Sequence, residues 1–141
     1  MIRILALGLL ALPISAFADC RTSTAEPFKQ FLESFANDKH FAIARTEYPL
    51  RYIRYEEPDV EQEGRTAIKS VVDRSTDLAQ PTMAGYARDN DVELNTISLK
   101  KARAVVRIAK PHTDALIVDY HFGRKGACWY LRRIENQSLS D

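Results

Sequence analysis

Four strand-like segments follow one another closely in the C-terminal half of the chain, and this pattern constrains the fold most strongly. Each segment is rich in β-branched or aromatic residues, and short polar or glycine-containing stretches separate them. The segments cover residues 92–99, 102–109, 115–122 and 128–134. Because strands joined by short turns pair with antiparallel neighbours, this half of the chain predicts an antiparallel sheet.

Helical patterns precede these strands. Phe28, Phe31, Leu32 and Phe35 recur at the spacing of one helix face, and Pro27 suits the first turn of such a helix. We expect a Thr or Ser within residues 22–24 to cap it. Asp38 would cap a second helix over residues 39–47, which Pro49 would end.

The remaining elements complete the order. Residues 50–55 and 67–72 have strand character. A short helix is expected to begin near Pro81, with this proline in its first turn. Helices followed by a mostly antiparallel sheet predict an α+β domain.

The first 18 residues have the three regions of a secretory signal peptide. Arg3 supplies the positive charge, residues 4–12 form an apolar run, and Ala16-Phe17-Ala18 offers a cleavage site. That run is too short to span a bilayer, which needs about 20 helical residues. We expect cleavage after Ala18, a single domain over residues 19–136 and a frayed tail over residues 137–141. The location would be periplasmic or secreted, with no membrane span in the mature chain.

The charge balance bears on the class of partner. The chain has 20 Lys and Arg against 19 Asp and Glu, so removal of Arg3 with the signal peptide leaves a formally neutral protein. Nucleic acid binding needs a basic surface, and we therefore expect no nucleic acid partner.

Cys20 and Cys128 are the only cysteines. In an oxidising compartment two cysteines favour a disulfide, and the alternative is two unpaired thiols. The cysteines and histidines have none of the close spacings typical of metal sites, so we expect neither a metal nor another cofactor.

Two longer motifs resemble the nuclear-transport-factor-2-like, or cystatin-like cone, superfamily. In residues 120–134 an aromatic strand turns through a basic, glycine-containing loop into a Trp-x-Leu strand that ends in Ile134. The opening of the chain is similar to a bacterial envelope family of unknown function within that superfamily, through the pattern Phe28-x-x-Phe31-Leu32-x-x-Phe35-x-x-Asp38-x-x-Phe41-x-x-x-Arg45-x-x-x-Pro49-Leu50.

This resemblance implies a curved, cone-shaped sheet wrapped around the helices, with a pocket at its open end. Some members of the superfamily are enzymes, such as ketosteroid isomerases and small polyketide cyclases, and many others only bind a ligand or a protein. Fold alone does not fix function.

Asp119 and His121 are the candidate catalytic residues. They lie two residues apart on one expected strand, so both project from the same face. If that face lined the pocket, a carboxylate and an imidazole would be placed for general acid–base catalysis. The alternative is a polar face that points into solvent, with Tyr120 and Phe122 on the opposite, core-facing side.

Four further residues are candidates for ligand binding: Arg45, Tyr52, Tyr86 and Trp129. Arg45 follows the core-facing Phe41 by one helical turn, so we expect either a buried ion pair or a pocket arginine that binds an anion. Candidate acids for that pair are Glu33, Asp38 and Glu47. Half-buried tyrosines on a sheet usually pack with a solvated hydroxyl, whereas a cluster at one end would suggest a binding face.

The sequence thus favours an exported, non-catalytic module that binds a small ligand or an envelope protein. Two alternatives stay open: an isomerase- or cyclase-like enzyme with Asp119 or His121 as the general base, and a periplasmic immunity protein. A homodimer through the sheet face is a further possible assembly.

Overall fold

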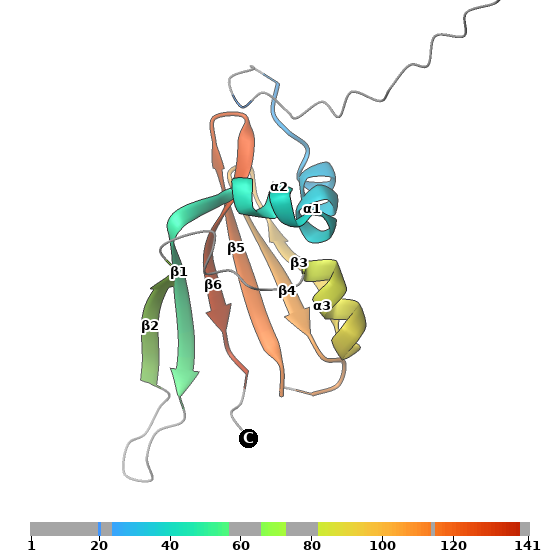
Figure 1. Cartoon of the computed structure of the whole chain (residues 1–141), viewed down its shortest axis with the longest axis vertical. Coiled ribbons are helices and arrows are strands. Elements are labelled where there is room, and N and C mark those ends of the chain that lie inside the picture. Colours follow the sequence, from blue (N-terminus) through green and yellow to red (C-terminus); the bar gives the residue numbers. More distant parts are fainter. Residues whose placement is uncertain (1–19, 21–23, 57–65, 73–81, 114, 139–141) are drawn as a thin grey trace, which may run out of the picture.

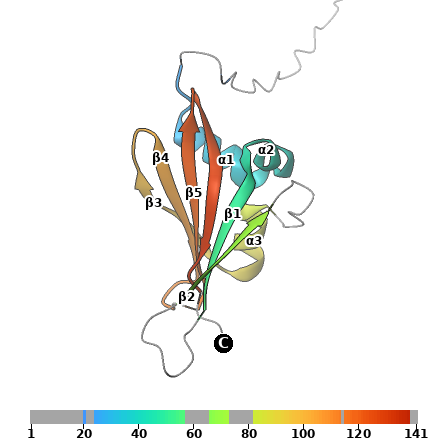
Figure 2. The ribbon, with the colours of Figure 1, turned by 90° about the vertical axis from the view of Figure 1, so that its left-hand side faces the viewer.

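In the part of the chain that the structure describes, nine elements form one layer of helices on one sheet. The computed structural model describes residues 20, 24–56, 66–72, 82–113 and 115–138. Figures 1 and 2 show the helices on one side of the sheet. The elements are α1 Phe28–Asn37, α2 Lys39–Ala44, β1 Thr46–Glu56, β2 Thr66–Val72, α3 Met83–Asn90, β3 Glu93–Leu99, β4 Arg103–Ala109, β5 Ile117–Lys125 and β6 Cys128–Asn136.

The aromatic face of α1 forms the centre of the core. Phe28, Phe31 and Phe35 are buried, as their helical spacing predicts. Their rings contact Phe122 of β5 at centroid distances of 5.1–5.8 Å, and Phe28 lies 5.0 Å from the ring of Trp129. Burying each of these rings contributes roughly 2–3 kcal/mol, so the sheet rather than helix propensity stabilises α1.

The cap predicted for α1 is wrong for the described residues. Pro27 itself occupies the N-cap position, and no side chain caps the helix. Residues 22 and 23, the other predicted caps of α1, and Pro81, predicted in the first turn of the later helix, lie outside the described residues. For α2 the prediction is confirmed, because the Asp38 carboxylate accepts hydrogen bonds from the backbone N–H groups of His40 and Phe41.

The junction of α2 and β1 differs from the prediction. The helix ends at Ala44 instead of residue 47, and the strand begins at Thr46 and runs through Pro49. Pairing with β6 decides the change, since Thr46 lies opposite Leu131 and the Leu131 N–H donates to the Arg45 carbonyl. Proline has no backbone N–H to donate to a neighbouring strand. Pro49 is tolerated because it lies where the β1–β6 register shifts, between Thr46 and Arg51, and regular pairing is interrupted there.

Within the described residues, the sheet has six strands in the order β2-β1-β6-β5-β4-β3. Four of the neighbouring pairs are antiparallel, and β1 runs parallel to β6. The α+β class and the mostly antiparallel sheet predicted from the sequence are therefore confirmed. The parallel pair arises because β1 joins the last strand of the chain, which short-range turn patterns do not reveal.

The two faces of the sheet have different surroundings. Ala104, Val106 and Ile108 of β4 lie on the face that packs against the helices, hereafter the helix side, and are buried. Val105 and Arg107 alternate with them and belong to the other face, hereafter the open face. In the part of the chain that the structure describes, no helix covers the open face (Figure 2).

The hairpin of β5 and β6 turns later than predicted. β5 continues through Gly123 and Arg124 to Lys125, and the tight turn uses Gly126 at φ 61°. A side chain at Gly126 would be strained at this φ, and its Cβ would lie 3.0 Å from the Cys20 carbonyl oxygen. The turn therefore needs glycine for its backbone and for the close approach of the N-terminal segment.

The end of the described chain is held to the sheet. Gln137 and Ser138, which we expected in a frayed tail, both bond to β5. The Gln137 N–H donates to the Ile117 carbonyl at 2.8 Å, and the Ser138 hydroxyl accepts from the Ile117 N–H at 3.0 Å. Residues 139–141 lie outside the described residues.

Candidate functional site

A pocket lies between the helices and the helix side of the sheet, hereafter the helix-side pocket. Its volume is about 90 Å³. Most of its wall is apolar, from Phe35 of α1, Ala42 and Ile43 of α2, Met83 of α3, and Leu131 and Ile134 of β6. An apolar wall with few polar groups is the usual chemistry of a small-molecule site.

Tyr120 of β5 also lines this pocket. Burial, and then the neighbouring Tyr86 and Tyr52, raise the pKa of the Tyr120 phenol to about 12. The phenol therefore keeps its proton at neutral pH and can donate a hydrogen bond. No described residue bonds to it, so this donor is available to a ligand.

The other polar groups at the pocket have defined places. The Thr46 hydroxyl donates to the Ala42 carbonyl at 2.7 Å, and the Thr82 hydroxyl accepts from the Gly85 N–H at 3.0 Å. Lys39 lines the pocket and is exposed, so this residue lies where the pocket opens to solvent. The pocket thus combines an apolar interior with one available hydroxyl and a cation at the entrance.

Tyr52 and Tyr86, two of the predicted ligand-binding residues, lie close to Tyr120 but outside the pocket wall. The Tyr52 hydroxyl accepts a hydrogen bond from the Asn136 amide at 3.2 Å. Half-burial with a bonded hydroxyl matches the packing role that a sheet tyrosine usually has. Tyr120, which the sequence pattern assigned only to the core, is the tyrosine that meets the pocket.

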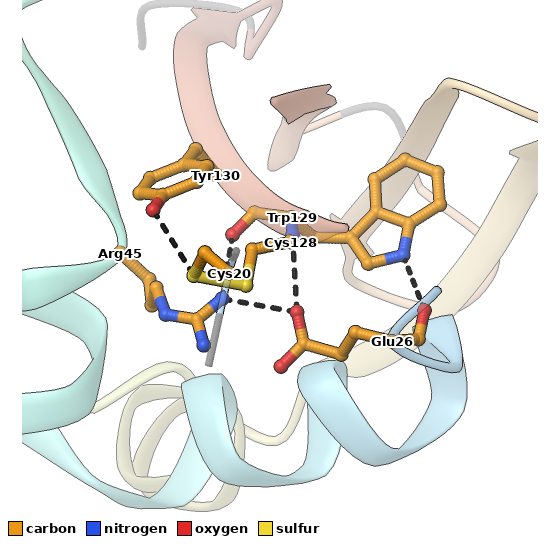
Figure 3. The surroundings of a disulfide bond; sticks show 6 residues. All are labelled: Cys20, Glu26, Arg45, Cys128, Trp129 and Tyr130. Carbon is orange, nitrogen blue, oxygen red and sulfur yellow. Dashed lines mark hydrogen bonds and ion pairs between the residues drawn. A yellow bond between two sulfur atoms is a disulfide. The ribbon is translucent and has the colours of Figure 1, made fainter. Parts of the chain in front are cut away.

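Arg45 and Trp129, the other two predicted ligand-binding residues, belong to a buried network beside the disulfide (Figure 3). Arg45 bonds to the Glu26 carboxylate at 3.0 Å, and both side chains are at least nine-tenths buried. The predicted buried ion pair is confirmed, but its acid is Glu26 rather than Glu33, Asp38 or Glu47. Helix periodicity could not indicate Glu26, because it lies before α1 and is brought close by the β6 strand.

Glu26 joins three parts of the chain. Its carboxylate also accepts from the Trp129 N–H at 3.0 Å, and its carbonyl accepts from the Trp129 indole at 3.1 Å. The Arg45 guanidinium lies 5.0 Å from the ring centroid of Phe41 and 5.5 Å from that of Tyr130, so both charges sit among aromatic rings. This closed network stabilises the fold and leaves Arg45 engaged within the protein.

The predicted disulfide is confirmed. Cys20 and Cys128 are bonded, and the bridge spans 108 residues of sequence. The Tyr130 hydroxyl lies 3.4 Å from the Cys20 sulfur (Figure 3). The bridge fastens the segment before α1 to the start of β6, directly beside the Glu26 network.

Asp119 lies on the open face, opposite to Tyr120 and the pocket. It is only 4% exposed, so alternation wrongly suggested a solvated residue. The Arg107 guanidinium binds its two carboxylate oxygens at 2.7 and 2.8 Å, and the Gln137 amide adds a bond at 2.9 Å. Donation of these hydrogen bonds to Asp119 raises the pKa of Arg107. The carboxylate is thus fully engaged and faces away from the pocket.

His121 shares that face, as predicted, but has its own partners. The Glu135 carboxylate lies 3.2 Å from its Nε2, and an Arg133 nitrogen lies 3.2 Å from the ring. Burial, followed by the charge of Arg133, lowers the pKa of His121. The geometry therefore gives Asp119 and His121 two separate ion-pair networks and no access to a ligand in the helix-side pocket.

The lowered pKa of His121 makes a prediction about pH and stability. The folded protein binds this proton more weakly than the unfolded protein, so the His121 contribution to stability is present above the ordinary pKa of about 6.5 and is lost as pH falls below it. We expect the free energy of unfolding of the native protein, relative to His121→Gln, to decrease between about pH 7.5 and about pH 5. Urea unfolding at several pH values measures this, and a constant difference would contradict it.

Across the described ranges, no three His, Cys, Asp or Glu side chains are grouped to hold a metal ion. No described helix has the length and apolar character needed to cross a membrane.

Comparison with known proteins identifies the fold. No protein-family model matches the chain, and no curated protein matches it. Among solved structures, an NTF2-like protein from Bacteroides fragilis superposes with a TM-score of 0.58 at 19% identity, over 81% of this chain and 48% of that chain. This chain therefore spans about half the length of that protein.

Two further solved structures are more distant. A protein of unknown function from the DUF3225 family of Pectobacterium atrosepticum has 15% identity and a TM-score of 0.40, over 80% of this chain and 85% of that chain. An NTF2-like protein of unknown function from Pseudomonas putida has 9% identity and a TM-score of 0.37, over 81% and 82%. These two scores are too low to support an argument. The element order, the sheet topology and the Bacteroides fragilis structure together show that this chain has the nuclear-transport-factor-2-like fold.

Proposed function

We propose that this protein is an exported, non-catalytic binding module whose helix-side pocket takes the apolar end of a small polar-headed molecule. The available Tyr120 hydroxyl in a mostly apolar wall is the observation that carries this proposal. A cavity of about 90 Å³ is smaller than the cavity of roughly 150 Å³ that holds benzene. A short aliphatic segment therefore fits, with a polar group bonded to Tyr120 and an anionic group near Lys39.

The export part of the proposal rests on the sequence of residues 1–18 and is compatible with a disulfide between Cys20 and Cys128. The signal segment lies outside the described residues. Non-catalytic binding is favoured over an isomerase- or cyclase-like activity because Asp119 and His121, the general bases that activity would use, bond to other residues on the open face.

A titration with two simple ligands tests the pocket. We expect hexanoate and 1-hexanol to shift amide resonances of the pocket residues in ¹H–¹⁵N NMR spectra, with hexanoate binding more tightly because of Lys39. Tyr120→Phe removes the donor and should weaken both ligands about threefold to tenfold, the effect of one neutral hydrogen bond. Ala42→Leu fills the cavity and should abolish the shifts.

Tyr55→Phe is the matched control, because it deletes the same hydroxyl from a strand residue whose phenol bonds to Glu135 on the open face. Its affinities should equal those of the native protein. Unchanged binding in both Tyr120→Phe and Ala42→Leu would contradict the proposal.

A further inference from the structure

The open face contains two adjacent hollows, hereafter the first and second hollow. The first has a volume of about 370 Å³ and the second about 340 Å³. Arg51 and Arg133 line both, and so lie between them. Arg103, His121 and Arg132 complete the basic lining of the first hollow, and Lys69 lines the second.

Strand register explains why these basic side chains meet. His121 of β5 pairs with Arg133 of β6, and Arg133 pairs with Arg51 of β1. The three side chains thus form a row across adjacent strands, about 5 Å apart at the backbone. Lys69 lies on β2, directly opposite Ile53 of β1, two residues along from Arg51.

A β-bulge adds a second consecutive arginine to the first hollow. His121 pairs with Arg133 and Phe122 pairs with Leu131, so Arg132 is the extra residue on β6. Normal alternation would send Arg132 to the opposite face from Arg133, yet both line the hollow. The absence of a side chain at Gly123 leaves space for the Arg132 side chain, because a Cβ at this position would lie only 2.5 Å from the Arg132 Nε.

The acids near these cations balance only part of the charge. Glu47 pairs with Arg132 at 3.2 Å, and Glu135 pairs with Arg133 at 3.4 Å while also bonding to His121. Among the described residues no ion pair or hydrogen bond engages the side chain of Arg51, Arg103 or Lys69. Both hollows therefore keep an excess of positive charge, although the expected mature chain is formally neutral.

We propose that the open face binds a small soluble molecule that carries two phosphate groups, one in each hollow. Guanidinium groups match phosphate oxygens in geometry and charge, and each phosphate offers several acceptors. Arg51 and Arg133 would contact both phosphates, Arg103 and Arg132 the first, and Lys69 the second. The division into two hollows, each the size of a small-molecule site, is what selects two separate anionic groups.

A second copy of the chain fits this surface poorly. A symmetric dimer through the hollows would place the same cations of both copies against each other, because a two-fold interface pairs one patch with itself. Like charges at that distance disfavour association. A small bisphosphate, by contrast, complements the positive charge of this face.

The experiment compares fructose 1,6-bisphosphate with fructose 6-phosphate by calorimetry at about 20 mM salt, where screening is weak. We expect the bisphosphate to bind at least about tenfold more tightly, the effect of one additional charge-assisted contact. Arg51→Gln should weaken bisphosphate binding about tenfold or more. Arg103→Gln and Lys69→Gln should each remove most of the preference for two phosphates over one.

Arg88→Gln is the matched control, since it removes one exposed positive charge from α3 on the helix side of the sheet. It should leave both affinities unchanged. Equal affinity for the two sugar phosphates, or equal losses in Arg88→Gln and Arg51→Gln, would overturn the proposal. So would binding to phosphatidylglycerol vesicles without binding to the soluble bisphosphate, since that result assigns the face to a membrane.

Discussion

Loss of the disulfide should lower the free energy of unfolding by about 4 kcal/mol. A bridge across 108 residues removes loop-closure entropy from the unfolded chain, which corresponds to roughly 4–5 kcal/mol for loops of this length. The double variant Cys20→Ser/Cys128→Ser measures the effect by urea denaturation. Trp129 reports the transition, because it is the single tryptophan and is 1% exposed in the fold.

The reduced native protein is the control for this variant, and both should unfold at the same urea concentration. The isolated protein should show no free thiol when it is denatured without reductant. A destabilisation below about 1 kcal/mol, well under the usual range for native disulfides, would contradict the assigned role of the bridge. Two free thiols in the isolated protein would contradict its formation in the cell.

Glu26→Gln should be the most damaging change of a single charge. It leaves the Arg45 guanidinium buried without a counter-charge, and breaking a buried pair from one side typically costs about 3–5 kcal/mol. We expect a loss of about 3 kcal/mol, because glutamine can keep one hydrogen bond to the Trp129 N–H. Thermal or urea unfolding measures it.

A double-mutant cycle separates the ion pair from other effects of the substitution. Arg45→Met alone should also be destabilising, and Glu26→Gln/Arg45→Met should cost less than the sum of the two, since no unpaired charge remains. Glu33→Gln on the exposed side of α1 is the matched control and should change stability by less than about 0.5 kcal/mol. Strictly additive losses in the cycle would show that Glu26 and Arg45 do not act as a pair.

Local patterns predicted most of the fold. Helix α1, the strands β3 to β6 and the antiparallel pairing between them follow from residue periodicity and turn residues, which act over short distances. The β1–β6 pair and the early start of β1 did not follow, because both depend on a contact between Thr46 and Leu131. The local pattern predicts that Pro49 ends a helix, whereas Pro49 lies within a strand at a shift of register.

The candidate site was predicted less completely. The shared face of Asp119 and His121 followed from strand alternation, but their burial and separate partners depend on Arg107 and Glu135 from the neighbouring strands. Tyr120 was assigned to the core, since alternation shows which side a residue faces and not whether a pocket lies there. The pairing of Cys20 with Cys128 was predictable because the chain offers no other cysteine.

The site on the open face also lay beyond sequence reasoning. Arg132 and Arg133 are consecutive in the sequence, and regular strand alternation would place them on opposite faces of the sheet. Only the bulge opposite His121 and Phe122 brings both to one hollow, and only the register of β1 adds Arg51. The net charge of the chain is close to zero, although positive side chains are concentrated on one face of the sheet.

The most direct test of the central claim locates a bound apolar ligand. In a complex with hexanoate, we expect intermolecular NOEs from the terminal methyl group of the ligand to the side chains of Ile43, Met83, Leu131 and Ile134, which line the helix-side pocket. NOEs to Val105 on the open face, with none to these four residues, would contradict the claim that this pocket is the binding site.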